Sequence, residues 1–114
     1  MNQQESFFNT LYQNFNDRNI DAVISLMTED VKWANGMEGG FVYGHEGVRE
    51  YWTRQFLVVS AVVTPIKISP ENGSVKIQVR QVVHDLNDHL LEDKMVEHIF
   101  HLENGRIKEF IIGE

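Results

Sequence analysis

The chain has 114 residues, 42% of them hydrophobic and 24% charged, which predicts one globular domain covering residues 1–114. The formal net charge of −7 excludes a nucleic-acid partner, because a phosphate-binding surface needs clustered Lys and Arg side chains. The absence of cysteine excludes disulfides, thiolate metal sites and cysteine nucleophiles. With no signal-peptide pattern and no apolar run long enough to span a bilayer, we expect no membrane partner and a cytoplasmic location.

The first part of the chain predicts two helices and two short strands. Residues 4–16 carry apolar side chains at helical spacing, so they are expected to form an amphipathic helix. A second, short helix is expected to begin at Asn19, with the Asn19 side chain accepting a free amide of the first turn. Its buried face would run from Ile20 to Met27. Residues 31–33 and 41–43 read as strands on either side of a glycine-rich loop.

The second part predicts one more helix followed only by strands. Residues 46–55 place large apolar side chains along one side of a third helix. Four strands are then expected, separated by turn sequences rich in Asn, Asp and Gly, at residues 62–68, 74–85, 90–102 and 106–112. Helices followed by a run of antiparallel strands indicate an α+β fold and not an alternating βαβ arrangement.

Pairing residues 74–85 with residues 90–102 around Asn87-Asp88 sorts their side chains onto two faces. The more apolar face, expected to face the core, carries Val75, Ile77, Val79, Gln81, Val83, Lys94, Val96, His98 and Phe100. The opposite face includes Met95 and Ile99, and Arg80 and Glu97 could pair diagonally across it. This mixed outer face predicts a homodimer interface, whereas the alternative is an exposed sheet face with a weak ion pair.

Four segments in chain order resemble the NTF2-like superfamily, and within it the SnoaL-like proteins. They are Phe15–Ala22 at the join of the first two helices, Thr28–Trp33 at the first strand, Gly44–Trp52 at the third helix and Leu102–Ile107 before the last strand. The resemblance implies a cone in which three N-terminal helices pack on a curved, mostly antiparallel sheet and enclose a pocket. It also implies a homodimer through the outer sheet face. The fold alone does not choose among the family's activities.

Ketosteroid isomerase, a member of this superfamily, offers the sharpest comparison of residues. Its mechanism uses an Asp base and an oxyanion hole made of a Tyr and a protonated Asp. By the resemblance, the base position falls on Asn35 and the oxyanion Asp position on His98. The oxyanion Tyr position falls on Leu11, with Tyr12 one residue away. Because the Asn35 amide cannot abstract a proton, we predict no steroid isomerase activity.

Two polar residues are therefore the candidate catalytic centre. Asn35 either hydrogen-bonds a ligand or serves as a turn residue that tolerates unusual backbone angles. His98 is either a pocket acid, base or ligand donor, or a buried histidine satisfied by a neighbour such as Gln81 or Asn35. Its position on the inward face predicts desolvation, which lowers the pKa of its imidazole.

Six aromatic residues are the candidate ligand-binding wall, although each is also a reasonable core residue. They are Tyr12, Trp33, Trp52, Phe56, Phe100 and Phe110. No metal or cofactor is predicted, because strand alternation separates His98 from His84 and His101. Two functions remain open: a binder of a small, largely apolar molecule with isomerase, lyase or cyclase-type proton transfer, or a non-catalytic accessory homodimer.

Overall fold

The computed structural model describes residues 3–113, which form three helices and six strands. The helices are α1 (Gln3–Asn16), α2 (Ile20–Ile24) and α3 (Gly44–Phe56). The strands are β1 (Met27–Ala34), β2 (Phe41–Tyr43), β3 (Val59–Glu71), β4 (Ser74–Asp85), β5 (Leu90–Glu103) and β6 (Arg106–Gly113). The predicted α+β class is confirmed, and β1 and β3 begin earlier than the sequence pattern indicated.

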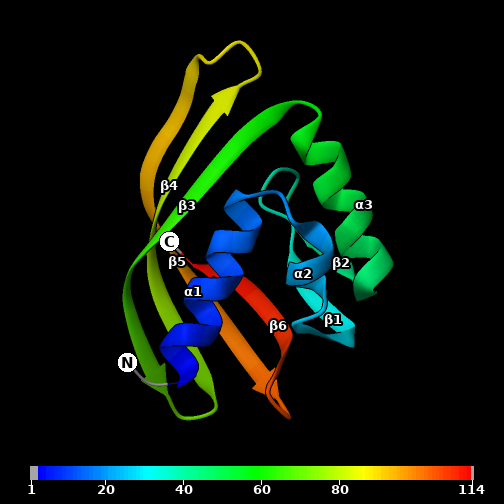
Figure 1. The fold of residues 1–114 in the computed structure, drawn as a ribbon, viewed down its shortest axis with the longest axis vertical. Helices are drawn as coiled ribbons and strands as arrows, with labels where there is room; N and C mark the ends of the chain where they lie inside the picture. The colour runs from blue at the N-terminus through cyan, green and yellow to red at the C-terminus, as the bar shows by residue number, and fades with distance from the viewer. Residues whose placement is uncertain (1–2, 114) are drawn as a thin grey trace.

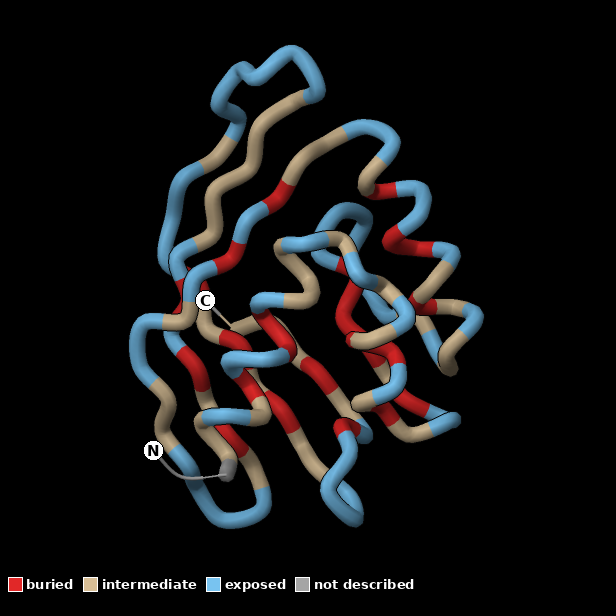
Figure 2. Tube along the Cα trace, in the orientation of Figure 1, coloured by how far each residue is buried: buried red, intermediate tan, exposed pale blue. Residues whose placement is uncertain are grey.

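The six strands form one sheet in the order β2-β1-β6-β5-β4-β3. Every neighbouring pair is antiparallel except β1 and β6, which run parallel. Figure 1 shows the sheet bending around α1, with α3 beside β1 and β2 and the β4–β5 hairpin projecting beyond the helices. The buried positions gather where the helices face the sheet (Figure 2), so the hydrophobic core lies on the concave side.

The predicted faces of the β4–β5 hairpin are confirmed. Ile77 lies opposite His98 and Val79 lies opposite Val96, and all four side chains are buried on the concave side. The diagonal partner of Arg80 on the outer face was predicted wrongly. Its guanidinium binds both carboxylate oxygens of Asp93, at 3.0 and 2.7 Å, instead of Glu97. Arg80 lies directly opposite Met95, so the register leaves two diagonal positions, and Asp93 occupies the one that forms the bidentate pair.

Two predictions about α2 were also wrong. Asn19 occupies the N-cap position, but its Oδ1 accepts no hydrogen bond from the first turn of α2. Its Nδ2 donates to Asn14 Oδ1 at 3.3 Å. Met27 belongs to β1 and not to the helix. The amide of Ile107 donates to the Leu26 carbonyl at 2.8 Å, so pairing with β6 ends the helical pattern before Met27.

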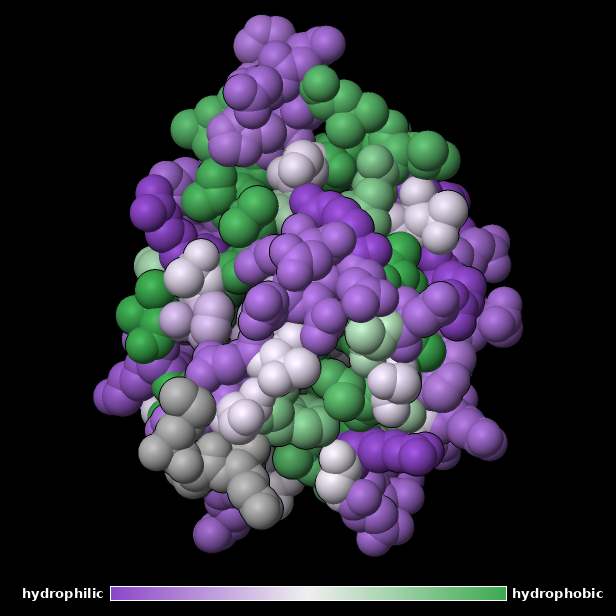
Figure 3. Space-filling model, viewed as in Figure 1, coloured by the Kyte–Doolittle hydropathy of each residue, from purple (hydrophilic) through white to green (hydrophobic). Residues whose placement is uncertain are grey.

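Most of the surface over the helices is hydrophilic, with hydrophobic side chains exposed below the tip of the β4–β5 hairpin (Figure 3). Leu86 and Leu90 flank that tip and are each more than half exposed. Within residues 3–113, no helix is long and apolar enough to cross a membrane.

Candidate functional site

A cavity of about 710 Å³ lies between α1, α3 and the concave face of the sheet. This volume falls in the range of roughly 300–1,000 Å³ that small-molecule sites occupy. Five of the six predicted wall residues line it: Tyr12, Trp33, Trp52, Phe100 and Phe110. Both candidate catalytic residues, Asn35 and His98, also line it. The fold thus brings seven of the eight predicted site residues to one cavity.

The aromatic wall is built from rings in contact with one another. Trp33 stacks on Phe110 with ring centroids 4.2 Å apart, and Trp33 and Trp52 make a T-shaped contact with centroids 5.3 Å apart. Phe100 packs on Phe110 at 5.0 Å. Because each ring is held by its neighbours, the wall presents a fixed apolar surface to the cavity.

Phe56 is the predicted wall residue that does not line the cavity. It lies at the end of α3, where its ring packs against Phe15 at 5.5 Å. The guanidinium of Arg18 sits 4.3 Å from the Phe56 ring centre, a cation–π contact. Phe56 therefore fastens the end of α3 to the turn after α1.

His98 and Tyr12 form the polar centre of the cavity. Tyr12 Oη lies 2.8 Å from His98 Nδ1, and both side chains are buried. The partner of His98 is thus Tyr12, and not Gln81 or Asn35. Burial lowers the pKa of His98 from 6.5 to about 3 and raises the pKa of Tyr12 well above its usual value of 10. Both groups are therefore neutral at pH 7.

The hydrogen bond assigns the histidine tautomer. Among residues 3–113, the only acceptor within reach of the Tyr12 hydroxyl is His98 Nδ1. A phenol is a good donor and a neutral imidazole nitrogen is a good acceptor, so Tyr12 donates and Nδ1 accepts. The imidazole proton then resides on Nε2, which makes no hydrogen bond within residues 3–113. The Nε2–H of His98 is thus a neutral donor that lines the cavity and has no protein acceptor among these residues.

Asn35 lines the cavity but also organises the loop that follows β1. Its Oδ1 accepts hydrogen bonds from the amides of Met37 at 3.1 Å and Glu38 at 2.9 Å. Its main-chain amide donates to the Gly40 carbonyl at 2.9 Å. The carboxamide oxygen is occupied by the loop, so Asn35 is a turn residue. Its backbone does not take the left-handed angles that the turn interpretation invoked.

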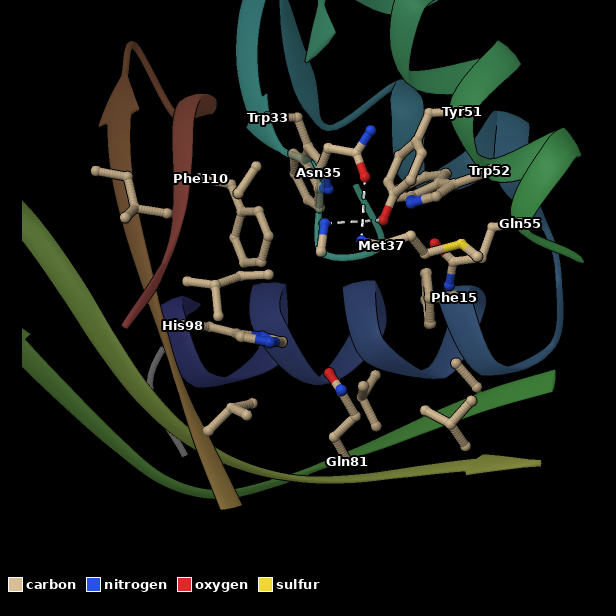
Figure 4. A pocket seen from close by; sticks show the side chains of 18 of the residues that line it. Phe15, Trp33, Asn35, Met37, Tyr51, Trp52, Gln55, Gln81, His98 and Phe110 are labelled. Atoms are coloured by element: carbon tan, nitrogen blue, oxygen red, sulfur yellow. Dashed lines mark hydrogen bonds between the residues drawn. The ribbon is translucent and has the colours of Figure 1, made fainter. Parts of the chain in front are cut away.

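Three further polar residues line the cavity that the sequence interpretation had not placed in a site: Tyr51, Gln55 and Gln81 (Figure 4). Tyr51 Oη accepts a hydrogen bond from the Gly36 amide at 3.0 Å, which ties the loop to α3. Gln81 Nε2 donates to Glu92 Oε1 at 2.5 Å. Gln55 is only 9% exposed. Its spacing of three residues from Trp52 was the signal that could have placed it on the inward face of α3.

Within the described part of the chain, no three His, Asp or Glu side chains are close enough together to hold a metal ion. The charged residues that line the cavity are Glu92 and Lys94, whose charged groups lie 3.5 Å apart. The arrangement can therefore hold a neutral, largely apolar molecule and donate a hydrogen bond to it.

Solved structures share this fold at low sequence identity. An NTF2-like protein of unknown function from Burkholderia pseudomallei K96243 is 20% identical, with a TM-score of 0.86 over 98% of this chain and 90% of that one. TerC, co-crystallised with polyporic acid, is 23% identical with a TM-score of 0.80, covering 90% and 83% of the two chains. The epoxide hydrolase/cyclase-like enzyme SalBIII is 16% identical with a TM-score of 0.82, covering 97% and 89%.

No curated protein sequence matches the chain. The family model of the SnoaL-like domain matches residues 8–110, which include all three helices in part or whole and extend into the last strand. The chain therefore belongs to the SnoaL-like domain family.

Proposed function

We propose that this protein binds a small, largely apolar molecule in the aromatic cavity and holds one of its oxygen atoms with the Nε2–H of His98. The observation that carries the proposal is the buried Tyr12–His98 hydrogen bond at 2.8 Å. This bond fixes the imidazole and leaves its second nitrogen as a donor beside the stacked rings of Trp33 and Phe110. Apolar pockets with a few fixed polar groups are typical of small-molecule sites.

Two similar structures support a ligand of this kind. TerC was crystallised with polyporic acid, and SalBIII is described as having a role in pyran ring formation in salinomycin. Both are similar to this chain in fold, and their ligands and reactions are their own. The TerC complex supports the proposal that this architecture can bind an organic molecule.

A second candidate function is isomerase, lyase or cyclase-type chemistry, favoured by the same hydrogen-bonded pair. A neutral donor fixed in an apolar site stabilises negative charge that develops on a carbonyl oxygen. With a pKa of about 3, however, His98 is a poor general base at neutral pH. Asn35 supplies no carboxylate, so steroid isomerase chemistry is not part of this proposal. The site is better suited to binding and polarising a carbonyl than to abstracting a proton.

Fluorescence of the two tryptophans tests the binding proposal, because Trp33 and Trp52 both line the cavity. We expect 2-acetylnaphthalene, an aromatic ketone, to quench this emission with a saturable curve. In His98→Leu the dissociation constant should rise roughly 10-fold, since the ketone oxygen loses its donor. Tyr12→Phe should weaken binding by a smaller factor, because the imidazole remains but is no longer oriented.

Tyr43→Phe is the matched control, because Tyr43 is 64% exposed and does not line the cavity. Its dissociation constant should equal that of the wild type. The absence of saturable quenching up to the solubility limit of the ketone would refute the proposal. An unchanged affinity in His98→Leu would remove His98 from it.

A further inference from the structure

Gln55 is a buried amide that no protein group satisfies. It lies near the end of α3, is 9% exposed and lines the cavity. The other two polar residues that are buried in the described part of the chain, Asn35 and His98, both have hydrogen-bond partners. Among residues 3–113, no group is hydrogen-bonded to the Gln55 carboxamide. Its nitrogen and oxygen atoms remain accessible to solvent. The hydrogen-bond partners of Gln55 must therefore be water or a ligand in the cavity.

Gln81 is another glutamine that lines the cavity, and its side chain has a hydrogen-bond partner within the protein. Its Nε2 donates to Glu92, which also pairs with Lys94. Gln55 has no such neighbour: it shares the inward face of α3 with Trp52, and Phe15 lies beside it (Figure 4). An unmatched amide among aromatic side chains costs free energy unless water or a ligand supplies the hydrogen bond.

Gln55 and His98 lie on different sides of the cavity. His98 projects from β5 beside Phe110, whereas Gln55 projects from α3 on the opposite side of the view in Figure 4. The two free polar groups differ in chemistry, because His98 offers only the Nε2–H donor and Gln55 offers both an N–H donor and a carbonyl acceptor.

We infer that Gln55 is a second ligand-binding residue, and that the ligand is a flat, neutral aromatic molecule with an oxygen function at each end. A ketone or quinone oxygen would accept from His98, and a hydroxyl group would bind the Gln55 carboxamide. The two charged groups that line the cavity, on Glu92 and Lys94, pair with each other. They leave no counter-charge for an ionised ligand, so the ligand is expected to be neutral. This inference rests on the proposed function and names the substrate class of the same site.

Two matched probe molecules test the role of Gln55 separately from the proposed binding to His98. 2-Acetylnaphthalene carries the ketone alone, and 6-acetyl-2-naphthol adds a hydroxyl at the far end of the same ring system. Tryptophan quenching in the wild type should give a dissociation constant roughly 10-fold lower for 6-acetyl-2-naphthol. In Gln55→Leu that preference, measured as the ratio of the two dissociation constants within the variant, should fall below about 3-fold.

Gln13→Leu is the control, because Gln13 is an exposed glutamine of α1 outside this cavity. It should keep the full preference for the hydroxylated probe. Equal affinities of the two probes in the wild type, or a preference that survives Gln55→Leu, would overturn the inference while leaving the proposed function intact. Failure of both probes to bind would refute the proposed function itself. Gln55→Glu, which keeps the shape of the side chain, tests the site should the leucine variant not fold.

Discussion

Burial determines what His98 can do, at the scale of a single residue. In water an imidazole changes charge close to neutral pH, but in this cavity burial lowers the pKa of His98 to about 3. The Tyr12 hydroxyl strengthens the same preference, because it donates to the neutral form of the ring. His98 is thus a fixed hydrogen-bond donor and not a proton carrier at physiological pH.

This shift predicts how folding stability depends on pH. The pKa of His98 is lower in the folded state than in the unfolded state, where it is near 6.5. The unfolded chain therefore binds a proton more readily, and stability from this group is complete above pH 6.5 and declines as pH falls toward 3. At pH 5 the loss relative to pH 7.5 should be about 2 kcal/mol.

Urea unfolding of the wild type and of His98→Gln at both pH values measures this loss. Glutamine does not titrate, so the difference between the two proteins isolates the contribution of His98. The same pH dependence in both proteins, or an NMR titration of the His98 ring near pH 6.5, would contradict the burial of a neutral imidazole.

For individual residues, the sequence pattern predicted which face a side chain occupies but not its hydrogen-bond partner. The inward position of His98 followed from strand alternation and is confirmed. Its partner did not follow, because Tyr12 lies 86 residues earlier and only the packing of α1 on the sheet brings the two together. The loop bonds of Asn35 likewise depend on backbone geometry that composition leaves open.

At the scale of elements, one side chain joins α1 to the edge of the sheet. Asn16 Nδ2 donates to the Val63 carbonyl at 2.8 Å, and Asn16 Oδ1 accepts from the Val63 amide at 2.9 Å. Val63 lies in β3, an edge strand whose outward main-chain groups have no neighbouring strand. The Asn16 carboxamide therefore takes the place of a paired residue and positions α1 over the cavity.

Replacing Asn16 should loosen this junction. Asn16→Ala removes both hydrogen bonds and leaves the main-chain groups of Val63 to water, so we expect a loss of roughly 1–3 kcal/mol in the free energy of unfolding. Thermal and urea unfolding measure it. Asn9→Ala is the control, because Asn9 is exposed on the same helix, and it should be neutral or slightly stabilising. Equal stabilities of the two variants would show that Asn16 does not anchor α1.

At the scale of the whole molecule, the outer sheet face carries the prediction of a homodimer. Met95 is 54% exposed there, and the Arg80–Asp93 ion pair lies beside it. Exposed apolar side chains rimmed by polar groups are typical of protein interfaces. A dimer through this face would leave the concave side, and hence the cavity, open to ligand.

Sedimentation equilibrium at micromolar concentration tests this arrangement. We expect a mass of twice the 13.3 kDa of the chain for the wild type, and a monomer for Met95→Lys, which places a charge in the interface. Leu57→Lys is the control, because Leu57 is 68% exposed in the turn after α3 and should leave the dimer unchanged. A wild-type mass near that of one chain would end the prediction.

By itself the sequence determined the class and order of the elements, the two faces of the β4–β5 hairpin and the family. These depend on periodicity and turn residues, which act over a few neighbouring positions. Only the tertiary structure decided where α2 ends, which groups hydrogen-bond to His98 and Asn35, and that Gln55 lines the cavity without a protein partner. The hydrogen bonds between Ile107 and Leu26, and between Tyr12 and His98, join residues far apart in the chain. Such contacts exist only once α1 has packed on the curved sheet, so no local pattern specifies them.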